Sequence, residues 1–188
     1  MLRGDKVGLR AREAADVPVL HDELHGDVLT YARGTSRAWT PMTAGSAADP
    51  CGLAPEDDLS RARFSVVDVR SGELLGQCGL FGIDPLSRNA ELGISLRPGA
   101  RGRGFGADVV AVLCWYGFDV RGLHRIEIET LADNAAMRAT ARAAGFTEEG
   151  LRRQAAWVDG TFLDAVRYGL LAPEWRASRP RPSTATTA

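Results

Sequence analysis

Three glycines alternate with other residues in one short segment of the sequence, Arg101-Gly102-Arg103-Gly104-Phe105-Gly106. The segment follows a strand pattern and leads into a helix pattern. Glycines let backbone N–H groups approach an anion, and a helix start adds roughly half a positive charge, so this loop suits a phosphate group. Its two arginines add full charges. Taken alone, the pattern is equally compatible with a glycine-rich turn that carries two solvated arginines.

Two common nucleotide motifs are absent from this loop. A dinucleotide-binding fingerprint would need Gly-x-Gly-x-x-Gly and a later acidic residue, and a Walker loop would need Gly-Lys followed by Ser or Thr. A phosphate-loop nucleotidase therefore stays only as an alternative.

Further motifs on both sides of the loop agree with one family. The loop, preceded by Leu96-Arg97-Pro98, resembles the acyl-coenzyme A pyrophosphate loop of the GNAT family of N-acetyltransferases. The order and spacing of the other motifs are similar to the RimJ/RimL-type branch, which acetylates the N-termini of ribosomal proteins. These motifs are Ala90-Glu91-Leu92-Gly93, His124-Arg125-Ile126-Glu127, Asn134, residues 144–150 and residues 159–171. The resemblance spans roughly residues 7–175 and is specific for the superfamily but weak for the substrate.

The resemblance implies acetyl-coenzyme A as donor, no metal, and a set of cofactor-binding residues. Backbone groups of Ile94, Ser95 and Leu96 would hold the pantetheine arm, and residues 101–106 would hold the pyrophosphate. Asn134 matches a family asparagine that hydrogen-bonds the pantetheine, and it is equally natural as a helix N-cap. Both roles are compatible.

The implied reaction is direct attack of a neutral amine on the thioester. An alkylamine has a pKa of ~8 to 10, so a base or a water relay must remove a proton. We favour Glu91 as the catalytic base, with Glu129 as the second candidate and Glu127 as the third. A surface salt bridge is an equally good explanation of each of these carboxylates.

The positions that supply a proton to the leaving thiolate in relatives hold other residues in this chain. Relatives place a serine three residues after the asparagine or a tyrosine about seven residues after it, but this chain has Met137 and Ala141 there. Tyr31, Tyr116, Tyr168 or water are candidate substitutes. A non-catalytic acyl-coenzyme A sensor is the alternative that this departure raises.

The resemblance implies that the irregular segment of residues 34–59 covers the acceptor site. This segment contains Trp39 as a candidate substrate contact, together with Pro41 and Met42. Its carboxylates would favour a cationic amine, although a solvated loop explains them as well; they are Glu56, Asp57 and Asp58. We expect the acceptor to be a primary amine, either a protein N-terminus or a small molecule. Transfer of a larger acyl group such as succinyl is an alternative. A homodimer is the expected assembly.

The elements that must position these residues form an α+β pattern around one mixed sheet. Strands are predicted at residues 7–10, 64–69, 74–81, 90–96 and 125–130, followed by two short strands within 157–171 that turn at Asp159-Gly160. Helices are predicted from an Asp16 cap onward, over 104–120 and over 134–144. The central strand, loop and buried helix carry the cofactor motif.

Length and composition bound the remaining possibilities. A chain of 188 residues with 45% hydrophobic content builds one domain, predicted at residues 1–175, and the small, basic and proline-rich segment 176–188 is predicted to be disordered. A net charge of −1 argues against nucleic-acid binding.

No signal-peptide pattern and no apolar run of ~20 residues is present, so we expect a cytoplasmic protein without membrane contact. Three widely spaced cysteines predict reduced thiols, and His21 and His25 read as two polar residues on a helix face rather than metal ligands.

Overall fold

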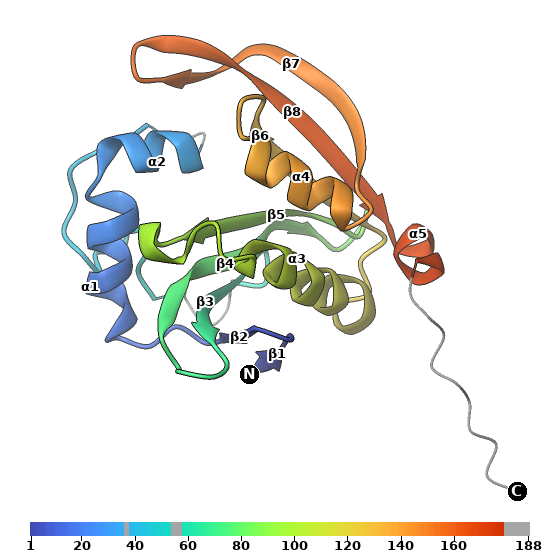
Figure 1. Ribbon diagram of the computed structural model, residues 1–188, viewed down its shortest axis with the longest axis horizontal. Coiled ribbons are helices and arrows are strands. Elements are labelled where there is room, and N and C mark those ends of the chain that lie inside the picture. Colours follow the sequence, from blue (N-terminus) through green and yellow to red (C-terminus); the bar gives the residue numbers. More distant parts are fainter. Residues whose placement is uncertain (36–37, 54–57, 179–188) are drawn as a thin grey trace, which may run out of the picture.

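A computed structural model describes residues 1–35, 38–53 and 58–178 of the chain, and a single eight-stranded sheet dominates it (Figure 1). Its strand order is β1-β2-β3-β4-β5-β6-β8-β7. Neighbouring strands are antiparallel except β5 and β6, which are parallel. The strands are β1 (Leu2–Arg3), β2 (Val7–Arg10), β3 (Ala62–Asp68), β4 (Leu74–Asp84), β5 (Asn89–Leu96), β6 (Arg125–Leu131), β7 (Thr147–Val158) and β8 (Thr161–Leu171).

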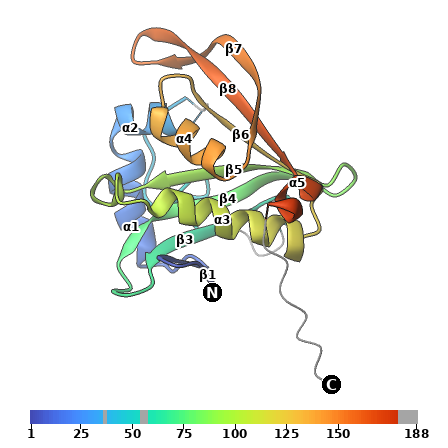
Figure 2. The same cartoon turned by 45° about the vertical axis from the view of Figure 1, so that its right-hand side comes forward.

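Helices cover the two faces of this sheet unequally. The helical elements are α1 (Asp16–Leu20), a π-helical turn (His21–His25), α2 (Val28–Gly34), a 3₁₀ turn (Pro98–Ala100), α3 (Phe105–Trp115), a second π-helical turn (Tyr116–Val120), α4 (Ala135–Ala143) and α5 (Ala172–Ala177). Figure 2 shows α3 crossing in front of β3 to β5, with α1 and α2 at the left of the view. The α1 residue Asp16 bonds Ser65, whereas the next residue of β3, Val66, packs in the core with α3. Successive side chains of a strand point to opposite faces, so α1 and α3 lie on opposite faces of the sheet.

The hydrophobic core explains why α3 is apolar nearly all round. Its buried residues pack against alternate residues of the central strands, including Leu80, Leu92, Ile126 and Ile128, which are at most 2% exposed. The residues between them therefore point to the other face, which carries the charged side chains of the site. The predicted α+β domain with one mixed sheet is confirmed, and the three cysteines are free and buried.

The C-terminal hairpin differs from its prediction. Instead of two short strands, β7 and β8 contain 12 and 11 residues and form a long arm at the top of Figure 1. The predicted turn at Asp159-Gly160 is correct, with φ of 46° and 75°. The early part of β7 was missed because nearly all of it is exposed on both faces, which removes the apolar alternation that identifies a strand.

Two smaller expectations change at the edges of the fold. Asp16 lies inside α1 and does not cap it; its carboxylate binds Arg10, Ser65 and the Glu13 N–H. The helix α5 includes Arg176 and Ala177, which were predicted to be in the tail, and residues 179–188 of that tail lie outside the described residues. No helix in the described part of the chain is long and apolar enough to cross a membrane.

Candidate active site

The strands β5 and β6 part in the middle of the sheet. Their pairing covers only Asn89 to Glu91 on β5, opposite Arg125 to Glu127 on β6. Beyond it, β5 stays paired with β4 up to Leu96, while β6 stays paired with β8 up to Leu131. The edges that face each other therefore carry backbone groups without a strand partner, which suits an extended ligand that can use them.

The glycine loop follows β5 after the 3₁₀ turn Pro98–Ala100. Gly102 and Gly104 have φ of 73° and 79°, a left-handed conformation that a Cβ atom would strain, and Gly104 is the N-cap of α3. A Cβ atom added to Gly102 or Gly106 would meet nothing within 4 Å. The backbone at the start of α3 is thus open on this side, as a phosphate-binding loop requires.

Three cations lie on or next to this loop. Arg101 donates from Nε to the Leu96 carbonyl at 3.0 Å, and the Arg103 guanidinium lies 4.9 Å from the Phe105 ring centre. The Nζ atom of Lys6 lies 3.2 Å from the position that a Gly104 Cβ atom would take. This arrangement supplies the positive charge that a pyrophosphate needs.

Sequence reasoning missed Lys6, because nothing near it in the chain indicates a ligand. Asp108, in the first turn of α3, brings it to the loop. The Asp108 carboxylate accepts hydrogen bonds from the backbone N–H groups of Asp5, Lys6 and Val7 at 3.2, 2.7 and 2.8 Å. A Cβ atom at Gly4 would lie 2.5 Å from this carboxylate, so the close approach depends on glycine there.

Asn134 lies at the other side of the opening, at the start of α4. Its Oδ1 atom accepts from the Met137 N–H at 3.1 Å, which confirms the N-cap interpretation. Its Nδ2 atom donates to Thr130 Oγ1 at 3.1 Å. These bonds hold the amide at the end of β6, and its contact with pantetheine stays a prediction.

The three candidate bases lie on the face of the sheet opposite α3, and the structure brings them together. Glu91 and Glu127 are partners across the β5–β6 pair, and Glu129 is two residues further along β6. Desolvation raises the pKa of Glu91, and the negative charges of Glu129 and Glu127 act in the same direction while Arg167 opposes them. A raised pKa is the usual adaptation of a carboxylate that accepts protons near neutral pH.

The other two carboxylates are bound by arginines. Arg152 Nη1 and Arg167 Nε donate to Glu129 at 2.7 and 2.8 Å. Desolvation works to raise the pKa of Glu129, but these hydrogen bonds outweigh it and the pKa is lowered. Glu127 accepts from Arg125 Nε at 2.6 Å. Both are therefore less available as proton acceptors than Glu91.

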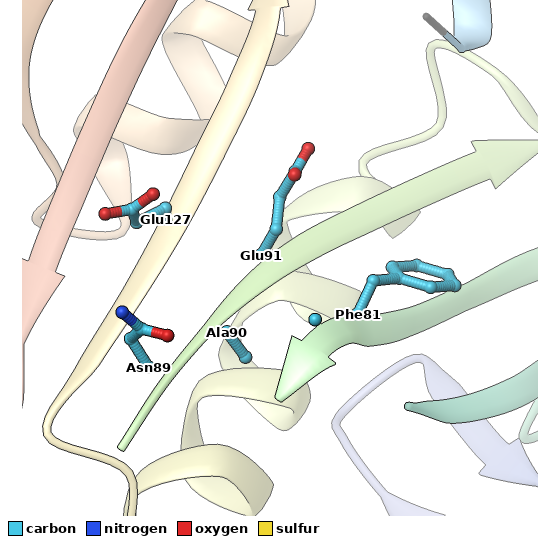
Figure 3. A pocket seen from close by; sticks show the side chains of 6 residues that line it. Phe81, Asn89, Ala90, Glu91 and Glu127 are labelled. Atoms are coloured by element: carbon cyan, nitrogen blue, oxygen red, sulfur yellow. The ribbon is translucent and has the colours of Figure 1, made fainter. Parts of the chain in front are cut away.

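A small pocket of about 210 Å³ adjoins Glu91 (Figure 3). Residues of β4, β5 and β6 form its wall: Phe81, Gly82, Asn89, Ala90, Glu91 and Glu127. The pocket lies beside the point where β5 and β6 begin to part.

Neither the residues at the family's usual donor positions nor Tyr31, Tyr116 and Tyr168 line this pocket. Ala141 is fully buried, and Met137 is partly buried against the core. The buried Tyr168 hydroxyl donates to Glu148 at 3.0 Å and accepts from Arg138 at 3.2 Å. Tyr116 lies beyond the C-terminal end of α3, about 16 Å along the helix from the loop. None of these residues is shown near the thioester position.

The segment predicted to cover the acceptor is only partly described. Glu56 and Asp57 lie outside the described residues, and Asp58 pairs with Arg61 at 2.5 Å. Trp39 donates from its indole N–H to the His25 carbonyl at 2.8 Å and stacks on the His25 ring. It does not line the pocket beside Glu91, so its contact with substrate stays a prediction.

The two histidines lie on the π-helical turn that follows α1, and both are buried. His21 Nδ1 lies 3.1 Å from Asp49 Oδ2, and His25 Nε2 lies 3.2 Å from the Thr40 carbonyl. They join the π-helical turn to the following irregular segment. In the described part of the chain, no three His, Cys, Asp or Glu side chains are placed to hold a metal ion.

A family model, the acetyltransferase (GNAT) domain, matches residues 6–147 of the chain. The chain belongs to this acetyltransferase family. The open glycine loop and the parted strands are compatible with a coenzyme A donor.

Sequence relatives agree with this assignment. The chain is 32% identical over 113 residues to the uncharacterized N-acetyltransferase p20 of Bacillus licheniformis, and 32% identical over 108 residues to YdaF of Bacillus subtilis, whose name assigns it provisionally to ribosomal N-acetylation. The matches cover 60% and 57% of this chain but only 64% and 59% of those relatives.

A solved structure confirms the fold over nearly its whole length. Spermidine N-acetyltransferase from Vibrio cholerae, in complex with coenzyme A and spermine, aligns with a TM-score of 0.77 and 23% identity. The alignment covers 90% of this chain and 98% of that one.

Proposed function

We propose that the chain transfers an acetyl group from acetyl-coenzyme A to a primary amine, with Glu91 as the proton acceptor. The observation that carries this proposal is the position of Glu91. It is the last β5 residue paired with β6, and its carboxylate therefore stands where the donor cleft opens and the acceptor pocket begins.

The residues that would hold the donor follow the parted strands. The unpaired edge of β5, at Ile94, Ser95 and Leu96, would bind the pantetheine arm, and Asn134 would face it from the start of α4. The loop of residues 101–106 would bind the pyrophosphate through backbone N–H groups, with added charge from Arg101, Arg103 and Lys6. Acetyl-coenzyme A, when bound, supplies the acetyl group as an activated thioester.

This chain would contribute a base and fixed hydrogen-bond donors to the reaction. Glu91 would accept the ammonium proton of the acceptor, directly or through water, and free the nitrogen lone pair for attack. Unpaired N–H groups on β5 would stabilise the developing oxyanion, a contribution of typically ~3 kcal/mol. We assign no side chain to protonation of the thiolate, since a thiol with a pKa of ~8.5 releases readily as the anion.

A double substitution in the loop tests donor binding. We expect Arg101→Ala with Gly104→Ala to weaken coenzyme A binding at least tenfold, or ~1.4 kcal/mol, because it removes a charge and strains the left-handed N-cap. Calorimetric titration with coenzyme A measures this. Gly99→Ala is the matched control, since a Cβ atom there meets nothing within 4 Å and φ is not left-handed. Unchanged affinity in the double variant would contradict the assignment of the loop.

The acceptor class is proposed from the relatives and the pocket. YdaF supports a protein N-terminus and membership of the RimJ/RimL-type branch, whereas the Vibrio cholerae enzyme supports a small amine.

We also propose a homodimer, because β7 has an outer edge without a partner among the described strands and the β7–β8 arm exposes Leu151, Trp157 and Phe162. Thioester consumption with an amine panel would separate an enzyme from a non-catalytic sensor.

A further inference from the structure

Two carboxylates, Glu91 and Glu127, line the acceptor pocket, and Glu129 lies two residues beyond Glu127 on β6. Glu127 is bonded to Arg125 at 2.6 Å, and Glu129 is bonded to Arg152 and Arg167. Among the described residues, the Glu91 carboxylate has no hydrogen-bond or ion-pair partner. Of these three carboxylates, that of Glu91 is therefore the one available to pair with a cationic nitrogen of the acceptor.

Asn89 supplies a second polar group to the same pocket. It lies two residues before Glu91 on β5, so both side chains rise from the same face of the sheet (Figure 3). Its amide likewise makes no side-chain hydrogen bond within the ranges that the structure describes. An amide is neutral and offers both donors and an acceptor, so it matches a carbonyl or an amide of a ligand better than a second ammonium group.

Phe81 supplies an apolar wall on the side of the pocket away from β6. It is the partner of Glu91 across the β4–β5 pair, and Gly79 and Gly93 are partners two residues away. Cβ atoms at these glycines would lie 3.1 and 3.0 Å from the Phe81 ring, so the ring packs directly on a backbone surface that only glycine leaves open. It remains 36% exposed, which leaves part of it free for a ligand.

We propose that this pocket selects a monoamine whose amine carries a neutral hydrogen-bonding group and an apolar group close by, as in the first residue of a peptide. Glu91 takes the amine, Asn89 pairs with the neutral group, and Phe81 packs against the apolar group. A polyamine fits less well, because each further ammonium group needs its own carboxylate and the neighbouring ones are held by arginines. This inference rests on the proposed acetyltransferase function.

The test compares two acceptors, an amidated dipeptide with a free N-terminus and spermidine, with acetyl-coenzyme A as donor. We expect the wild type to have the higher kcat/KM for the dipeptide. Phe81→Ala and Asn89→Ala should each raise the dipeptide KM about tenfold with little change in the KM for acetyl-coenzyme A, because each removes one acceptor contact. Asn89→Asp should shift the preference about tenfold toward spermidine, since it adds a second free carboxylate.

Leu86→Ala is the control variant, because Leu86 is 91% exposed in the β4–β5 turn and does not line the pocket. A wild-type preference for spermidine, or unchanged dipeptide KM in both alanine variants, would overturn the assignment of the pocket while leaving the acetyltransferase function intact. Failure of the wild type to consume thioester with any amine would instead contradict the proposed function, and with it this inference.

Discussion

Glu91 and Glu129 have the same side chain and lie on the same face of the sheet, but their surroundings separate them chemically. Glu91 is partly desolvated and has negative neighbours, so its pKa is raised. Glu129 is also partly desolvated, yet its hydrogen bonds from Arg167 and Arg152 lower its pKa. This difference supports Glu91 as the base, which the sequence favoured only slightly.

A pH–rate profile tests this difference. A base works only when it is deprotonated, so kcat should rise with pH through the raised pKa of Glu91. Glu91→Gln should remove this acidic limb and lower kcat, a loss of roughly 10²-fold or more. Glu129→Gln should keep the limb and move it to lower pH, because it removes a negative charge and frees Arg167 near Glu91. If both variants keep the wild-type profile, a water relay without either carboxylate is the better account.

The substitution Glu91→Gln also has an expected effect on the stability of the fold. A carboxylate whose folded-state pKa is raised stabilises the fold through its protonated form below its ordinary pKa, and this contribution is lost as pH rises through the raised value. At neutral pH the charged Glu91 therefore costs folding free energy. Glu91→Gln should unfold at the same or a higher temperature than the wild type, which would show that its lost activity is not a folding defect.

Hydrogen bonds connect the start of α3 to the turn between β1 and β2. Asp108 holds three consecutive backbone N–H groups of that turn, and Lys6 thereby reaches the glycine loop. The N-terminal segment thus contributes to a site that lies about 100 residues further along the chain. An element that seems peripheral in the sequence is part of the proposed cofactor-binding surface.

Two substitutions test this coupling. Lys6→Met should weaken coenzyme A binding several-fold and reduce its salt dependence, because one exposed cation near the phosphates is lost. Asp108→Asn should lower the free energy of unfolding by about 1 kcal/mol and also weaken binding, since the turn that carries Lys6 loses its charged acceptor. Calorimetry at two salt concentrations and thermal unfolding measure these effects. A normal affinity in Lys6→Met would exclude Lys6 from the site.

The molecule consists of a core in which α3 packs against the central strands, and of a long exposed arm formed by β7 and β8 (Figures 1 and 2). Trp157 and Phe162 pack edge to face on this arm, with ring centres 4.7 Å apart, and remain 61% and 57% exposed. Aromatic rings gain most of their stabilising energy by burial, so a second copy of the chain that covers them would stabilise the arm.

Sedimentation velocity tests the proposed dimer. We expect the wild type to sediment as a dimer and Trp157→Ser with Phe162→Ser to shift it toward monomer, because two large apolar contacts are lost. Leu59→Ser serves as a control, since Leu59 is 76% exposed but lies outside the arm. A wild type that sediments as a monomer at every concentration would contradict the proposal.

The amino-acid sequence determined the central cofactor motif, because its signals are local. The alternation of β5, the glycines with two arginines and the apolar α3 follow one another directly in the chain, and each reports backbone conformation or burial at its own position. The N-cap role of Asn134 and the turn at Asp159-Gly160 depend on similarly short ranges.

Only the tertiary structure decided which polar groups meet. Lys6 approaches the loop through Asp108, Phe81 lies on Gly79 and Gly93, and Glu91 stays free while arginines from β7 and β8 bind Glu129. These contacts join residues that are distant in sequence, and a carboxylate's pKa depends on such neighbours rather than on its own position in the chain. The loop and strands proposed to hold the donor could therefore be predicted from the sequence, whereas the chemical difference between Glu91 and Glu129 and the proposed acceptor pocket required the fold.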